Sequence, residues 1–197
     1  AGGKSADRHR LGDRCSTDAF DLDRVGGGEE AGHRVRTVGS GDRDRFAAHD
    51  ATPQVRYTQA IVNHGWEAGA SLAHPHGQIL GLPFVPGEIL DEERAFARFA
   101  GGCLLCTTVE AELSADERVV FANDDVAVIA PYWSGVPYEM LIVPRHHEVH
   151  LQDAPDQSLA DVGIPLRDAL GHPNAAIGDV ALNLGLHTAP HQHTGQY

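Results

Sequence analysis

One stretch, Asn63 to Pro83, constrains the fold of this sequence more than any other, because it joins a glycine-rich loop to the motif HPHGQ. The proline of the motif, Pro75, fixes its own φ and biases the residue before it towards extended backbone. In an extended strand alternate side chains share one face, so His74, His76 and Gln78 should lie side by side. The motif therefore predicts a β-strand that lines one wall of a pocket.

The surrounding residues predict a chain that contains both strands and helices. Val55–Val62 alternates and is rich in β-formers, so it should pair antiparallel with the motif strand, His74–Leu82, across the loop Asn63–Ala73. Pro165 should kink or divide the last helix. The other expected elements are a helix over Gly87–Ala100, a helix starting within Cys103–Glu112, strands over Arg118–Ala122, Val126–Pro131 and Tyr138–Pro144, a helix over Asp156–Leu170 and a strand over Asp179–Leu184.

The first 50 residues differ from the rest. They are dominated by Gly, Asp and Arg, and their apolar positions follow neither the helical nor the strand period for long. Low hydrophobicity with dense mixed charge favours weak folding or disorder. Cys15 is isolated there and is expected to be a free thiol. The Gly26–Gly28 run is no P-loop, because no Lys-Ser or Lys-Thr follows it.

Composition excludes several classes of partner. The formal net charge of −13 argues against binding to a nucleic-acid backbone, although a nucleotide needs only a few local donors. No window approaches a membrane span, and the N-terminus lacks the apolar core of a secretory signal. With three cysteines there is no disulfide framework, so we expect a cytoplasmic protein without nucleic-acid or membrane partners.

The HPHGQ motif predicts nucleophilic chemistry on phosphorus. A neutral imidazole such as His76 can attack phosphorus and split one transfer into two easier steps. Gln78 can donate to a phosphoryl oxygen as charge develops on it. Ser71 and the loop amides at Gly69 and Ala70 can hold further phosphate oxygens. The competing interpretation is a pair of polar histidines on an edge strand.

Taken together, NHGWEAGASLAHPHGQ resembles the active-site signature of galactose-1-phosphate uridylyltransferases, members of the histidine-triad superfamily. The likeness includes Asn63, Gly69 and Ser71 and continues through the turn PFVPGE. It implies an α+β fold with a histidine-triad-like (HIT-like) antiparallel sheet, flanking helices and two related half-complete domains. In that scheme residues 1–50 are atypical, 51–100 end the first domain and 101–197 form a second, truncated one, so we expect a fragment.

The resemblance also implies a reaction. His76 would be uridylylated by UDP-glucose with release of glucose 1-phosphate, and galactose 1-phosphate would then take the uridylyl group. Gln78 would stabilise the intermediate, Asn63 and Ser71 would contact phosphate, and the enzyme would be a homodimer. Hydrolases of the superfamily carry a third histidine where Gln78 stands, which favours transfer over hydrolysis. A phosphorylase or hydrolase of the superfamily, or an inactive metal-binding domain, are the alternatives.

Cys103 and Cys106 form a C-x-x-C pair, which offers two thiolates to one tetrahedral zinc. A redox dithiol and two ordinary buried cysteines are the competing interpretations. The resemblance implies that His147 is the third zinc ligand, and that His74 binds structural zinc. It also implies a second metal such as iron at Glu92 and His187.

Overall fold

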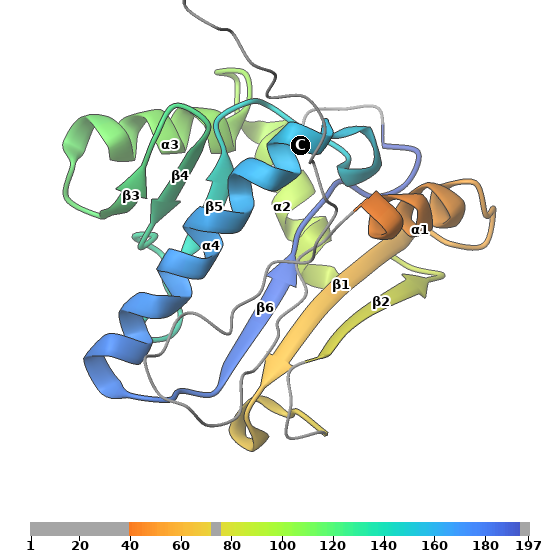
Figure 1. Cartoon of the computed structure of the whole chain (residues 1–197). Coiled ribbons are helices and arrows are strands. Elements are labelled where there is room, and N and C mark those ends of the chain that lie inside the picture. The colour runs from red at the N-terminus through yellow and green to blue at the C-terminus, as the bar shows by residue number, and fades with distance from the viewer. Residues whose placement is uncertain (1–39, 72–75, 194–197) are drawn as a thin grey trace, which may run out of the picture.

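The structure, a computed structural model, describes residues 40–71 and 76–193, which form two small antiparallel sheets and four α-helices (Figure 1). Residues 1–39, 72–75 and 194–197 lie outside the described residues, so the predictions for Cys15 and for the Gly26–Gly28 run are not addressed by it. The described part of the chain is α+β, as the sequence predicts.

The first sheet is built on β1 (Tyr57–His64), which pairs with β2 (His76–Leu82) on one side and with β6 (Leu182–Leu186) on the other. Both pairings are antiparallel, and the one between β1 and β2 is the hairpin that the alternation and the intervening loop predict. The strand predicted over Asp179–Leu184 lies a few residues later, as β6.

One face of this sheet is buried and carries Thr58, Ala60 and Val62, each at most 8% exposed. Helix α1 (Ser40–Asp50) contacts β1 on that side: His49 Nδ1 lies 3.0 Å from the hydroxyl oxygen of Thr58. Part of the segment predicted to be disordered is therefore a helix. Its anchor is Phe46, which is completely buried.

The second sheet has the order β3 (Val119–Ala122), β4 (Val126–Ile129), β5 (Leu141–Pro144). All four residues of β4 are completely buried, because helices cover the sheet. Helix α3 (Leu104–Ala115) packs Val109 against Ala127 and Val143. Helix α4 (Asp156–Ile177) contacts all three strands and lies in front of this sheet in Figure 1.

Two predictions about the second half need correction. Helix α4 is not divided at Pro165 and runs seven residues beyond the predicted end at Leu170. Pro165 is buried within it. A proline in a helix interior loses a backbone hydrogen bond and clashes with the preceding turn, which costs roughly 3 kcal/mol relative to alanine, and packing of α4 against the sheet offsets this cost. Strand β5 begins only at Leu141, because Tyr138 has φ 64° and cannot continue an extended strand.

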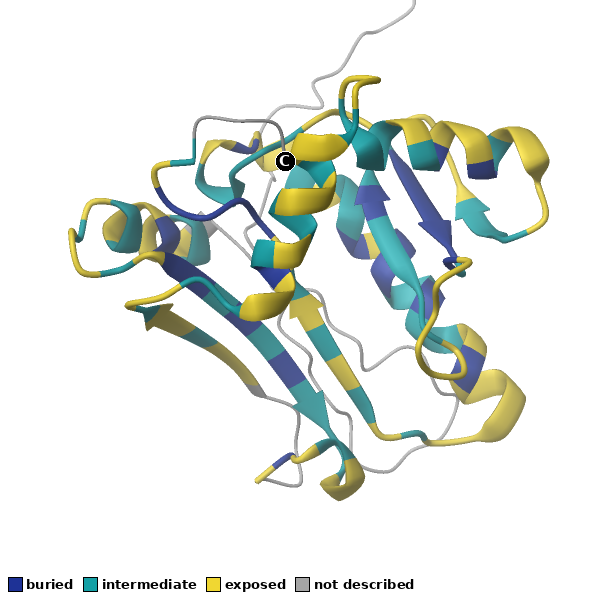
Figure 2. Cartoon of the chain, turned by 180° about the vertical axis from the view of Figure 1, so that it is seen from behind, coloured by how far each residue is buried: buried dark blue, intermediate teal, exposed yellow. Residues whose placement is uncertain are grey.

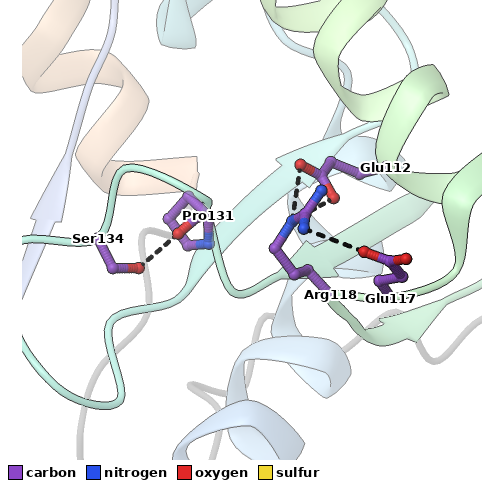
Figure 3. A network of polar contacts seen from close by, with 5 residues as sticks. All are labelled: Glu112, Glu117, Arg118, Pro131 and Ser134. Atoms are coloured by element: carbon purple, nitrogen blue, oxygen red, sulfur yellow. Dashed lines mark hydrogen bonds and ion pairs between the residues drawn. The ribbon is translucent and has the colours of Figure 1, made fainter.

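A charged contact joins α3 to the start of the second sheet (Figure 3). The Nε of Arg118 donates to both carboxylate oxygens of Glu112, at 3.1 and 2.9 Å, and Glu112 is buried. The guanidinium also lies 5.6 Å from the ring centre of Tyr132. The pairing satisfies a carboxylate that would otherwise be costly to bury.

The remaining elements are helix α2 (Gly87–Arg98), between β2 and α3, and two short 3₁₀ helices, Trp66–Ala68 in the β1–β2 loop and Leu151–Asp153 between β5 and α4. Arg43 of α1 donates to the carbonyl of Ala154 at 2.7 Å and pairs with Asp156 at the start of α4. Because β6 follows α4 yet joins β1, the chain returns to the first sheet after completing the second. The division into domains at residue 100 stays a prediction. Among the described helices, none has both the length and the apolar character that crossing a membrane requires.

Candidate active site on the open face of the first sheet

The face of the first sheet opposite α1 is open along β2 and β6, whereas Tyr57 at the start of β1 on the same face is completely buried. Opposing residues of antiparallel strands share a face, and the register therefore places Gln78, Ile61 and Gly185 in one row across it. Gln78 and Gly185 are exposed, whereas the alternate positions of β1 are buried. Figure 2 shows this difference as exposed colour along β2 and alternating colour along β1 and β6. The face is open to a ligand.

The next row across the same sheet joins three residues. The Cα of Asn63 on β1 pairs with that of His76 on β2 and with that of Asn183 on β6. The Nδ2 of Asn183 donates to Asn63 Oδ1 at 2.8 Å and to the carbonyl of Ala68 at 2.9 Å. The predicted nucleophile and a predicted phosphate ligand thus occupy directly opposed positions.

The glycine-rich loop after β1 is held by its own backbone. Gly65 has φ 83°, and a Cβ there would lie 2.8 Å from Cβ of Ala181, so only glycine fits. The amides predicted to hold phosphate are used within the loop: Gly69 N donates to the Trp66 carbonyl at 3.0 Å and Ala70 N to the Gly65 carbonyl at 3.1 Å. These bonds weigh against a phosphate role for those two amides, which stays a prediction.

Ser71 and His76 flank the part of the chain between β1 and β2 that lies outside the described residues. Ser71 is exposed at the loop end. His74 falls within residues 72–75, so the structure does not address its predicted role in zinc binding. The backbone of His76 begins β2, in agreement with the predicted strand.

Glu92 and His187, the residues predicted to bind a second metal, come from α2 and from the segment after β6. Glu92 Oε1 lies 2.8 Å from His187 Nδ1. The hydrogen bond with Glu92 raises the pKa of His187 above its usual value, against the opposing effect of burial. The two side chains, separated by 95 positions in the chain, therefore meet although no sequence pattern links them.

A hollow of about 300 Å³ lies on the other side of the sheet. Its wall includes Ala60, Val62, Leu184 and Leu186, which alternate with the open-face positions, together with Arg45 of α1. This hollow therefore lies mainly on the α1 side of the sheet and does not include the row that contains Asn63, although Ile61 and Gln78 also line it.

A scan against models of protein families finds no match for this chain. Curated proteins do match. The chain is 30% identical over 150 residues to ADP-glucose phosphorylase of Arabidopsis thaliana, covering 75% of this chain and 40% of that protein. It is 36% identical over 110 residues to galactose-1-phosphate uridylyltransferase of Thermotoga maritima, covering 54% and 33%.

Solved structures agree. A uridylyltransferase mutant superposes with a TM-score of 0.73 at 29% identity, over 79% of this chain and 51% of that one. The chain belongs to the galactose-1-phosphate uridylyltransferase family. It spans about 40% of the length of the first curated relatives that it matches.

Outside the first sheet, the chain carries a second group of metal-ligand type. The Sγ atoms of Cys103 and Cys106 and a ring nitrogen of His147 lie within 4.8 Å of one another. Burial raises the pKa of the Cys106 thiol to about 11, to which the hydrogen bond with Cys103 adds. Two thiols and an imidazole that converge in this way can hold a metal, and binding would displace the thiol protons.

Sequence analysis of this uridylyltransferase relative missed Asn183. An asparagine in a short apolar strand carries no chemical signature of its own, and its importance depends on β6 lying beside β1. His193 Nδ1 lies 2.8 Å from Glu93 Oε1 on α2. His191, two positions earlier, is buried. Only the folded chain reveals these three positions.

Proposed function

We propose that the open face of the first sheet carries the nucleotidyl-transfer chemistry of a uridylyltransferase, with His76 as the nucleophile. The observation that carries the proposal is the register pair of His76 and Asn63 on an exposed sheet face, in a chain of this family. An open polar face beside a glycine-rich loop suits a phosphate-bearing substrate, which needs donors and space.

The proposed reaction has two balanced steps. An imidazole nitrogen of His76 attacks the α-phosphorus of UDP-glucose, and the bond from that phosphorus to the bridging oxygen breaks, which releases glucose 1-phosphate. A phosphate oxygen of galactose 1-phosphate then attacks the same phosphorus and displaces the imidazole, which yields UDP-galactose. Dividing the transfer in this way replaces one difficult displacement with two easier ones.

Three side chains support the transfer in this proposal. Gln78, one row from His76 on the same strand, donates to a phosphoryl oxygen in the transition state. Asn63 and Ser71 hold the phosphates of the substrate. Gly69 and Ala70 shape the loop, because their amides already donate to loop carbonyls.

Two metal ions belong to the proposal. Zinc would be held by Cys103, Cys106 and His147, where it would cross-link the start of α3 to the segment after β5 as a structural ion. The close approach of Glu92 and His187 supports their role in binding a second metal such as iron. His74 would bind structural zinc, as the resemblance implies.

At the level of the whole protein, we propose a cytoplasmic homodimer that uses UDP-glucose and galactose 1-phosphate. The two three-stranded sheets would be the related halves of a HIT-like fold. The named relatives support the choice of substrates. Light scattering of the purified protein measures its oligomeric state directly.

A second candidate is a phosphorylase. The relative matched over the most residues of those described above is an ADP-glucose phosphorylase, at 30% identity. In that reaction inorganic phosphate takes the place of galactose 1-phosphate and the nucleotide carries adenine. The nucleophile and the first step are unchanged, so the acceptor and the base distinguish the two candidates.

Labelling tests both. The chain is incubated with UDP-glucose or ADP-glucose that carries a labelled α-phosphate, and protein-bound label is measured after gel filtration. We expect an acid-labile adduct in the wild type and none in His76→Asn, with His172→Asn on the exposed side of α4 as the matched control. Chasing the adduct with galactose 1-phosphate, phosphate or water identifies the acceptor. An adduct that survives His76→Asn, or a wild type that takes up no label, refutes the covalent mechanism.

A further inference from the structure

Asn183, on the edge strand β6, makes two hydrogen bonds that join three parts of the active-site region. Its Nδ2 donates to Asn63 Oδ1 on β1 at 2.8 Å and to the carbonyl of Ala68 in the glycine-rich loop at 2.9 Å. Both hydrogens of one amide are used. Asn183 therefore ties β6, β1 and the loop that leads to Ser71.

The chemistry of these contacts determines how both amides are turned. The carbonyl of Ala68 can only accept a hydrogen bond, so the atom of Asn183 that faces it must be the nitrogen. The other hydrogen of that nitrogen then faces Asn63, which must present its oxygen in return. The amide nitrogen of Asn63, with both of its hydrogens, is consequently turned away from Asn183.

We propose that Asn183 is a positioning residue that holds the amide of Asn63 with its N–H groups directed at a phosphoryl oxygen of the substrate; this inference rests on the function proposed above. An amide that turns freely offers its oxygen as readily as its nitrogen, and an oxygen repels a phosphate. Asn183 removes that alternative before the substrate binds, which is the form of preorganisation that favours anion binding.

The location of the pair agrees with such a role. Asn63 lies opposite His76 on one side and opposite Asn183 on the other, so the three occupy one row of the sheet. Asn183 is exposed on β6, next to the strand that carries Asn63 (Figure 1). If the asparagine pair were purely structural, it would stabilise the loop. The orientation of the Asn63 amide would then have no effect on the binding or reaction of an anionic substrate.

Replacing Asn183 by aspartate separates these possibilities, because aspartate keeps the shape but can only accept. Asn63 should then turn over, donate to the new carboxylate and present its oxygen to the substrate. We expect Asn183→Asp to slow the formation of labelled protein from UDP-glucose by about 10²-fold. Asn183→Ala, which leaves Asn63 free to choose the productive orientation, should slow it by only about 10-fold.

A double-mutant cycle shows whether Asn183 acts through Asn63. In the Asn63→Ala background, Asn183→Asp should have no further effect on the labelling rate, since the residue it orients is gone. If Asn183→Asp is as harmful in that background as in the wild type, its charge acts directly on the substrate and the inference is wrong. The matched control is Asn174→Asp, the same substitution at an exposed position of α4, which should leave the rate unchanged.

A binding measurement keeps this inference distinct from the proposed reaction. The ratio of the dissociation constants for uridine and UDP reports the contribution of the two phosphates. We expect Asn183→Asp to reduce that ratio by about 10-fold or more even where no covalent adduct forms. An unchanged ratio overturns the positioning role. A wild type that binds UDP-glucose but is never labelled refutes covalent transfer without touching this inference, whereas a wild type that does neither refutes both.

Discussion

The two sheets of this protein have the same size and the same antiparallel pairing, yet they differ in what their faces contact. The β3–β4–β5 sheet has helices against it, and its central strand is completely buried. The β2–β1–β6 sheet buries one face against α1 and leaves the other open, with Gln78, Asn63 and Asn183 on it.

The difference indicates how the chain divides its tasks. A strand with two buried faces has no room for polar chemistry, because each buried polar group would need a partner. A strand with one buried face can carry polar functional side chains at its exposed alternate positions with little loss of stability. The second sheet therefore supports the fold, whereas the first sheet supports the fold and also offers an open face for the proposed site.

We expect the largest effect on the free energy of unfolding from removing a buried side chain of the second sheet. Ile129→Ala removes a completely buried side chain from β4 and should lower the free energy of unfolding by about 2–5 kcal/mol. Leu80→Ala, at a position 44% exposed on β2, should change it by no more than about 0.5 kcal/mol. Urea denaturation of both variants checks the pair. Similar losses in the two would show that the sheets do not differ as described.

A substitution on the open face of the first sheet should leave stability unchanged but reduce the labelling rate. Gln78→Ala removes an exposed side chain, so the unfolding midpoint should stay near the wild-type value. The rate of protein labelling by UDP-glucose should fall by about 10²–10³-fold, since a donor to developing negative charge is lost. Stopped-flow or quench-flow labelling measures it, with Gln59→Ala as a control further along the same sheet. A Gln78→Ala protein that labels at the wild-type rate would remove this residue from the mechanism.

The metal site should affect stability alone. Cys106→Ser should abolish stoichiometric zinc binding, because two of the three converging ligands cannot close a site. The wild type should gain about 2.7 kcal/mol of stability when free zinc reaches 100 times its dissociation constant, and the variant should gain none. Thermal unfolding with and without a zinc chelator tests this, and Thr107→Ser is the neighbouring control. Equal zinc stabilisation of both proteins would contradict the assignment.

The smallest predicted effect is a pH dependence at the buried side of the first sheet. His191 Nε2 lies 2.7 Å from Thr58 Oγ1, and Asp50 Oδ1 lies 3.0 Å from its other ring nitrogen. Burial lowers the pKa of His191; Asp50 opposes the shift, while His150 and His49 reinforce it. The unfolded chain therefore binds more protons in this range, and the stability contribution is lost as pH falls below about 6.5.

Replacing that histidine should flatten the curve. His191→Gln should reduce the loss of stability between about pH 6.5 and 5, by at most about 1.4 kcal/mol per pH unit for one proton. Denaturation midpoints measured across that range provide the test. His172→Gln, an exposed histidine on α4, should leave the pH dependence as it is. A steeper loss in His191→Gln than in the wild type would reverse the sign of the prediction.

Local features of the sequence predicted much of this structure. The alternation in Val55–Val62 and the extended bias of HPHGQ correctly indicated the β1–β2 hairpin, and Asn63 and His76 lie opposite each other in it. The C-x-x-C at the start of α3 and His147 do converge. The hairpin depends on residues close together in the chain, where the connecting loop and the alternation determine the register. The approach of His147 to Cys106 over 41 positions was instead implied by the family resemblance.

Other features of the fold could not be predicted from local patterns in the sequence. The sequence around Pro165 did not predict that α4 would continue through this residue. The packing that offsets the cost of a proline within the helix comes from a sheet formed elsewhere in the chain. The same applies to Phe46, which anchors a helix in a segment whose composition resembles disorder.

The sequence by itself determined the chemistry available to this protein: a histidine, a glutamine and an asparagine brought to one strand pair, and two thiols at a helix start. Tertiary structure alone decided which strand would lie on the other side of β1. That choice brought Asn183 against Asn63 across 120 positions and His187 against Glu92 across 95. Strand periodicity specifies which residues share a face, but the neighbour at a sheet edge is selected by the packing of the whole chain, which no local pattern encodes.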